Sequence, residues 1–131
     1  MNPAQLSPLN LAYIGDTVFD MVVRTSLVCT ANEPVRSLNR KAASIVNAGS
    51  QSRMAERLLP LFTEEEAAVY QRGRNAKCAT HAKNASVAEY HRATGVEAVF
   101  GYLYLLGKKE RILQLFREAL PELKLQGEEF F

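Results

Sequence analysis

A strongly apolar segment of sixteen residues, Leu9–Arg24, carries a glycine and a carboxylate near its middle. At helical spacing Asp16 is flanked by Ala12 and Phe19, so the carboxylate is expected on the mostly buried face of a helix. Burying an ionised carboxylate costs several kcal/mol unless hydrogen bonds or a cation compensate. Gly15 beside it costs about 1 kcal/mol relative to Ala and typically marks a close approach of another backbone. We therefore expect a second helix to cross here.

The expected partner is the apolar segment at residues 93–106. It carries one acid, Glu97, with Gly101 one turn later on the same face. A crossing at the two glycines would bring Asp16 and Glu97 together. Adjacent carboxylates repel each other unless one is protonated or a cation lies between them, and oxygen ligands suit a hard cation. The residues alone leave open the alternative that both acids are structural.

Length and composition predict one domain. The chain has 131 residues, 47% of them hydrophobic, with a net charge of +2 that by itself is too mild to indicate nucleic acid. We expect a single domain over residues 1–131, with its core at about 6–118 and a frayed tail at 121–131. The apolar runs are shorter than the ~18 residues of a membrane span, and the N-terminus lacks a basic leader. A soluble, cytoplasmic protein with no membrane partner is expected.

Start and stop signals predict an all-α fold of about six to seven helices, because strand and hairpin patterns are absent. Thr63 and Ser86 each precede a Glu by three residues, which is a capping-box pattern. Asn32 and Pro34 indicate another helix start. The predicted helices cover residues 4–29, 34–46, about 50–59, 63–74, 86–107 and 108–120. Residues 75–85 lack apolar periodicity and are predicted to form a loop, which at this length is often functional.

Two segments resemble a known family. Y-I-G-D-T-V-F-D at residues 13–20 resembles the ribonuclease III signature, and V-E-A-V-F-G-Y-L-Y-L at 96–105 resembles the second acidic helix of that domain. The match is closer to the Mini-III subfamily, which lacks the double-stranded-RNA-binding domain. L-A-Y-I-G-D at 11–16, R-G-R-N-A-K at 72–77 and K-N at 83–84 also fit that subfamily. The resemblance spans about residues 6–118 and implies the ribonuclease III endonuclease fold.

Two positions depart from the larger ribonuclease III enzymes. Those enzymes carry an acid four residues before the signature Asp and another three residues before the second-helix Glu, where this chain has Ala12 and Thr94. The Mini-III pattern also lacks both acids, so we interpret the difference as a subfamily character. Because only two of the four carboxylates are present, the number of bound metal ions, one or two, stays open.

The resemblance implies a metal-dependent endoribonuclease that cleaves double-stranded RNA. Asp16 and Glu97 would be the catalytic and metal-binding residues. Mg²⁺ is commonly bound through one or two carboxylates plus substrate phosphate, so two acids suffice for one ion, and Mn²⁺ can substitute for it. In-line attack by a Mg²⁺-activated water would give 5′-phosphate and 3′-hydroxyl ends.

Basic side chains gather at residues 67–92, where five cations face one acid. Duplex RNA is recognised mainly through its shape, phosphates and 2′-hydroxyls. The candidates for RNA binding are Arg72, Arg74, Lys77, Lys83 and Arg92. The alternative reading of the same side chains is solubility and helix C-terminal chemistry.

Cutting both strands of a duplex needs two sites, and the resemblance implies a homodimer with part of the first helix at the interface. Phe19, Val22 and Leu27 fit either the core or that interface. Mini-III enzymes mature the large-subunit (23S) ribosomal RNA precursor with the assistance of a large-subunit ribosomal protein. The resemblance implies the same substrate and helper for this chain.

Two rival hypotheses remain at the level of sequence. The first is a catalytically inactive RNA- or ribosome-binding module of the same fold, suggested by Ala12 and Thr94. The second is a helical interaction protein whose acids are structural. Cleavage of duplex RNA that is lost on Asp16→Asn substitution would exclude both.

Overall fold

The computed structural model describes residues 1–77 and 86–131, and within them the protein is all-helical, as predicted. Short 3₁₀ turns, η1 to η3, lie at Pro3–Gln5, Leu59–Leu61 and Glu128–Phe130. The α-helices are α1 (Pro8–Thr30), α2 (Val35–Ile45), α3 (Ala48–Leu58), α4 (Glu64–Arg74), α5 (Val87–Leu105) and α6 (Lys109–Ala119). No helix in these two ranges is long and apolar enough to cross a membrane.

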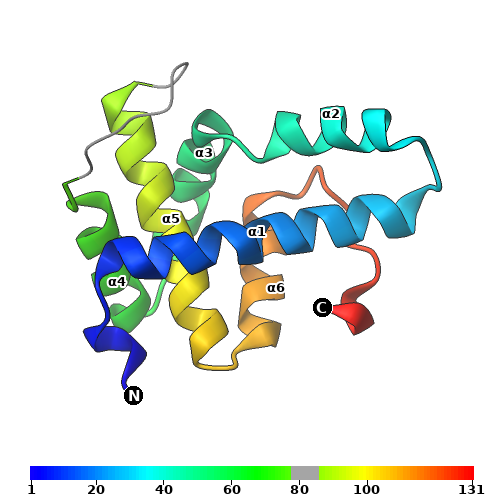
Figure 1. Cartoon of the computed structure of the whole chain (residues 1–131). Coiled ribbons are helices and arrows are strands. Elements are labelled where there is room, and N and C mark those ends of the chain that lie inside the picture. Colours follow the sequence, from blue (N-terminus) through cyan, green and yellow to red (C-terminus); the bar gives the residue numbers. More distant parts are fainter. Residues whose placement is uncertain (78–85) are drawn as a thin grey trace.

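Helix α5 lies at the centre of the bundle, and α1 crosses it (Figure 1). Helices α3, α4 and α6 also pack on α5, so α5 contacts most of the other helices. Helix α2 extends alongside the second half of α1, and only Ala42 of α2 is buried. The chain is thus organised around the α1–α5 crossing that the apolar segments predict.

The crossing is a contact between two main chains. A Cβ atom on Gly15 would lie 1.7 Å from the Glu97 carbonyl oxygen, and one on Gly101 would lie 1.9 Å from the Leu11 carbonyl oxygen. Neither space can hold a methyl group, so both positions require glycine. The predicted glycine-lined contact between the two acidic helices is therefore present.

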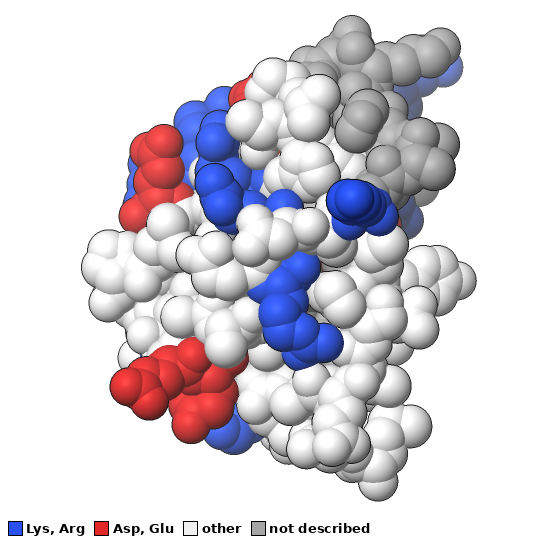
Figure 2. Space-filling model, turned by 90° about the vertical axis from the view of Figure 1, so that its left-hand side faces the viewer, with Lys and Arg blue, Asp and Glu red and all other residues white. Residues whose placement is uncertain are grey.

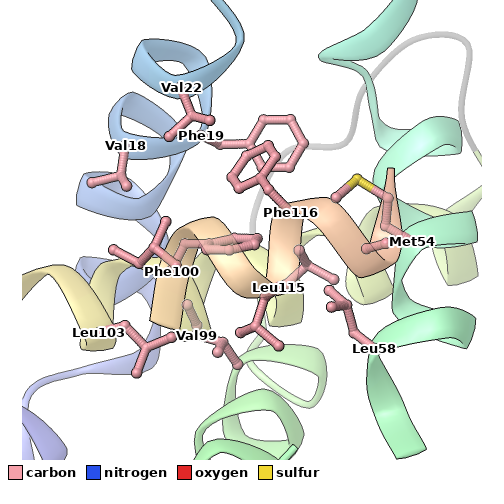
Figure 3. Close-up of a cluster of buried hydrophobic side chains, with 14 of the residues drawn as sticks. Val18, Phe19, Val22, Met54, Leu58, Val99, Phe100, Leu103, Leu115 and Phe116 are labelled. Atoms are coloured by element: carbon pink, nitrogen blue, oxygen red, sulfur yellow. The ribbon is translucent and has the colours of Figure 1, made fainter. Parts of the chain in front are cut away.

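Three phenylalanines hold the same crossing from the core side (Figure 3). The ring centroids of Phe19 on α1 and Phe100 on α5 are 5.7 Å apart, and Phe116 on α6 lies 4.8 and 4.9 Å from them. All three side chains are fully buried, which stabilises the fold by about 2–3 kcal/mol each. Phe19 and Val22 are therefore core residues, and Leu27 is partly buried against the core.

Helix starts agree with the sequence where a side chain caps the helix and differ elsewhere. The capping boxes at Thr63 and Ser86 are both formed, as predicted. The first helix begins at Pro8 and not at residue 4, because the N-terminal turn is a separate 3₁₀ segment. Asn32 does not cap α2, whose N-cap is Pro34 without a side-chain bond. Helix α3 starts at Ala48, because Asn47 accepts a hydrogen bond from the Ser50 amide.

The C-terminal tail is packed and not frayed, so that prediction was wrong. Gly127 adopts a left-handed conformation, with φ of +68°, that turns the chain into η3. Arg117 pairs with Glu128, and Phe131 packs against the core. The tail thus adds an apolar cover over the first turns of α6 and the second half of α1. Most of the predicted loop, residues 78–85, lies outside the described residues, and helix α4 gives way to the loop at Asn75.

Gly15→Ala should destabilise the protein by about 3 kcal/mol or more, at the upper end of the cost of overpacking, because the new methyl group meets main-chain atoms that cannot move aside. Chemical denaturation followed by circular dichroism measures the loss. Gly49→Ala is the matched control, since a Cβ there would meet its nearest neighbour at 3.4 Å, an ordinary contact. An equal effect of the two substitutions would contradict the close crossing.

Candidate active site

The structure brings Asp16 and Glu97 together from α1 and α5. Glu97 is the residue whose carbonyl faces Gly15, so the crossing places its side chain next to Asp16, and the two carboxyl groups are in hydrogen-bonding contact. Asp16 itself is exposed, which corrects the prediction of a buried position. It lies at the edge of the buried stripe of α1, one residue beyond Gly15. The partly buried acid of the pair is Glu97.

The pKa of Glu97 is raised from its ordinary value of 4.5 to about 9. Burial is the largest cause, followed by the hydrogen bond with Asp16 and the negative charge of that residue. Gln51 acts in the opposite direction by favouring the ionised carboxylate. Without a cation, the pair therefore retains a proton through neutral pH.

Gln51 is a member of the site that the sequence reasoning missed. It lies in the first turns of α3, only 4% of it is exposed, and its side chain meets the Glu97 carboxyl. Extending the predicted apolar stripe of α3 back from Met54 by three residues reaches Gln51. That spacing was the available signal, because a polar side chain at a buried register needs a partner.

The structure fills the positions of the two missing acids with small buried side chains. Ala12 and Thr94 are both buried. The Thr94 hydroxyl donates to the Tyr90 carbonyl oxygen at 3.0 Å, a bond within α5. Within residues 1–77 and 86–131, no group of three or more His, Cys, Asp or Glu side chains converges. Two carboxylates in contact nevertheless suit a hard divalent cation, since a cation can take the place of the shared proton.

A pocket of about 370 Å³ lies between the end of α4 and the first turns of α5. Arg92 forms part of its wall, and the Arg92 Nε donates to the Ser52 hydroxyl at 2.6 Å. Figure 2 shows separate Lys and Arg side chains on the face that includes α4, with acidic side chains toward one margin. The pocket is lined by Arg74, Asn75, Ala76, Lys77, Ala88, His91 and Arg92.

The predicted RNA-binding cations separate into three groups. Arg74, Lys77 and Arg92 share the pocket. Arg72 does not line it, and its guanidinium donates to the Ala4 and Leu6 carbonyl oxygens at 2.7 and 2.8 Å, which ties down the N-terminal turn. Lys83 lies outside the described residues.

Glu97→Gln should raise the melting temperature in EDTA, and the gain should grow with pH. Because the pKa of Glu97 is higher in the folded state, its stabilisation is fully present below pH 4.5 and is lost as the pH rises through about 9. Glutamine resembles the protonated acid at every pH. Melting curves of both proteins at pH 5, 7 and 9 measure the difference.

Glu89→Gln is the control, because the pKa of Glu89 is shifted in the opposite direction from that of Glu97. The capping-box bonds from Ser86 lower the pKa of Glu89, so this acid is ionised across the whole range of pH 5–9. Its effect on the melting temperature should stay nearly constant there. A gap between wild type and Glu97→Gln that does not widen with pH would contradict the raised pKa of Glu97.

Comparisons with known proteins agree with this geometry. The ribonuclease III domain model matches residues 9–108, which contain both acids. Mini-ribonuclease 3 of Thermoanaerobacter sp. is 42% identical over 120 residues, covering 89% of this chain and 84% of that protein. Mini-ribonuclease 3 of Staphylococcus aureus is 40% identical over 117 residues, covering 88% of this chain and 87% of that protein.

A solved structure extends the agreement to the fold. Protein FN1578 from Fusobacterium nucleatum superposes with a TM-score of 0.82 and 29% identity, covering 90% of this chain and 94% of that one. The sequence matches and the crossing of the two acidic helices lead to one conclusion. The chain belongs to the ribonuclease III domain family and is an endoribonuclease.

Proposed function

We propose that this endoribonuclease cleaves double-stranded RNA at the Asp16–Glu97 pair with the help of a divalent cation, Mg²⁺ or in its place Mn²⁺. The ribonuclease III family generally acts on double-stranded RNA and depends on divalent metal. The observation that carries the proposal is the contact of two carboxylates at the glycine crossing, where Glu97 keeps a proton that a cation would replace.

The two acids have different tasks. Asp16 is exposed and is the carboxylate that substrate and solvent reach, whereas Glu97 is held deeper in the bundle. A cation held by both would neutralise phosphate charge, lower the pKa of an attached water and support the leaving oxygen. Water that attacks the phosphorus in line with the leaving 3′-oxygen inverts the configuration at phosphorus and gives 5′-phosphate and 3′-hydroxyl ends. The rigid crossing fixes the acids before RNA binds.

The α4–α5 pocket supplies contacts to the RNA backbone. Arg74 and Lys77 are exposed at its rim, and Arg92 is anchored in its wall. An anionic phosphate is the ligand that such a pocket favours, and Arg is well suited to bind it. Arg72 serves the fold in this scheme, because its guanidinium already binds two carbonyl groups.

A homodimer would supply the second site that cutting both strands requires. Helix α1 carries exposed apolar side chains on its outer face: Tyr13 is 83% exposed, Met21 53% and Val28 59%. They recur at helical spacing, and such a stripe typically marks an interface. This stripe, and not the buried Phe19 and Val22, is the part of α1 that would meet the partner subunit.

The natural substrate that the family resemblance implies is the precursor of large-subunit (23S) ribosomal RNA, with a ribosomal protein as helper. A domain that binds RNA through a few cations has weak, salt-sensitive affinity. A helper that presents or shapes the RNA would compensate for that. Cleavage of a precursor transcript with and without large-subunit proteins is the direct comparison.

Long duplex RNA should be cut in Mg²⁺ and left intact in EDTA. Asp16→Asn and Glu97→Gln should each lower the cleavage rate about a thousandfold, since a cation at the scissile phosphate contributes several kcal/mol. Denaturing gels measure the rate, and Glu56→Gln, an exposed acid of α3, is the control. RNA that is bound but never cut would identify an inactive binding module. Absence of both binding and cleavage would favour a helical interaction protein.

Arg74→Ala and Lys77→Ala should each weaken binding of duplex RNA and reduce the slope of log affinity against log salt by about 1, as expected for one lost phosphate contact. Filter binding from 50 to 200 mM salt measures both quantities. Lys124→Ala removes the same charge from the exposed C-terminal tail and should leave the slope unchanged. A slope that is equal in all three variants would remove the pocket from the RNA interface.

Met21→Glu should convert the dimer to monomers, because it places a charge in the middle of the exposed stripe on α1. Sedimentation equilibrium measures the mass, and the cleavage assay should then show nicks in single strands. Leu59→Glu, at another exposed apolar position, is the matched control. A wild-type protein that sediments as a monomer at micromolar concentration would contradict the dimer.

A further inference from the structure

We infer that Gln51 is a positioning residue of the active site: its carboxamide holds the Glu97 carboxylate in place for the divalent cation. The inference rests on the proposed function and extends it to a third helix, α3. It assigns a task to a side chain that neither the sequence motifs nor the acid pair explains.

The first argument is the place of Gln51. Helix α3 packs along α5, and Gln51 is 4% exposed. Its side chain reaches the Glu97 carboxyl. Asp16 approaches the same carboxyl from α1. Glu97 is therefore held between a negative group on one helix and an amide on another.

The second argument is an unused hydrogen-bond donor. Within the described residues, the Gln51 Nε2 atom is buried and has no hydrogen-bond partner. A buried donor without an acceptor costs about 1–3 kcal/mol, so such groups generally have a reason to be present. The Glu97 carboxyl, which the Gln51 side chain reaches from α3, is an acceptor for this amide once a cation holds that carboxyl in place.

The third argument is the neighbouring contact. Ser52, the next residue of α3, accepts the hydrogen bond from Arg92 at 2.6 Å. Consecutive residues of one turn thus hold the acid of the proposed metal site and a cation of the proposed RNA pocket. Groups that orient metal ligands in this way typically change metal affinity by 10–100-fold when they are removed.

The experiment compares wild type with Gln51→Met, which keeps the length of the side chain and removes the donor. Mn²⁺ binding, without RNA, is measured by calorimetry and by the loss of the free Mn²⁺ electron paramagnetic signal. We expect the affinity to fall at least about tenfold. The melting temperature in EDTA should stay equal or rise, because the variant no longer buries an unpartnered amide. Ser50→Ala, a buried polar neighbour in the same turn, is the control and should bind Mn²⁺ as wild type does.

A merely structural role would give the reverse pattern, a lower melting temperature with unchanged Mn²⁺ affinity, and would overturn the inference. The proposed function would fail if wild type and Asp16→Asn bound Mn²⁺ equally or not at all. If Asp16→Asn abolished Mn²⁺ binding but Gln51→Met bound the ion as tightly as wild type, only the role of Gln51 would fail. A measurement on wild type alone tests the inference even if the Gln51→Met variant does not fold. The side-chain NH₂ signals of Gln51 should shift in nitrogen-15 spectra when Mg²⁺ is added, and signals that do not move would overturn the assignment.

Discussion

The contact between the main chains of α1 and α5 is the constraint on which the rest of the structure depends. Gly15 and Gly101 let each helix touch the other's carbonyl groups, and the phenylalanine cluster fills the space beside them. The site acids are one residue and four residues away from those glycines. Their mutual position is therefore set by helix backbones and not by loops, which is the more precise way to hold a catalytic group.

Two acids of this protein show how the surroundings decide the state of a carboxylate. Glu66 is almost fully buried, and burial opposes its ionisation. Arg111 nevertheless donates to both Glu66 oxygens, at 2.9 and 2.7 Å, and the pKa of Glu66 is lowered. Burial also raises the pKa of Glu97, and there the facing Asp16 raises it further. Within residues 1–77 and 86–131, the structural acid Glu66 thus has a cationic partner and the acid at the candidate site has none.

The amino-acid pattern predicted the features that rest on local rules. The glycines, the two apolar segments and the capping boxes at Thr63 and Ser86 all follow from spacing and backbone chemistry, and they gave the crossing and the starts of α4 and α5 correctly. Asp16 was placed too deep, because a residue at the border of a helical stripe has buried neighbours on one side only. The α3 stripe could have indicated that Gln51 is buried, but its contact with Glu97 and the anchoring of Arg72 depend on contacts across 46 and 66 or more positions of chain, which no local pattern reveals.

The small side chains at Ala12 and Thr94 limit how many acids the site can hold. Both are enclosed by packed neighbours, so a carboxylate introduced at either one would enter the interior beside a pair that already shares a proton. A single such substitution would therefore destabilise the packing of α1 or α5. A four-acid centre at these positions would need the surrounding side chains to change as well, so the number of site acids is tied to the interior packing of the two helices.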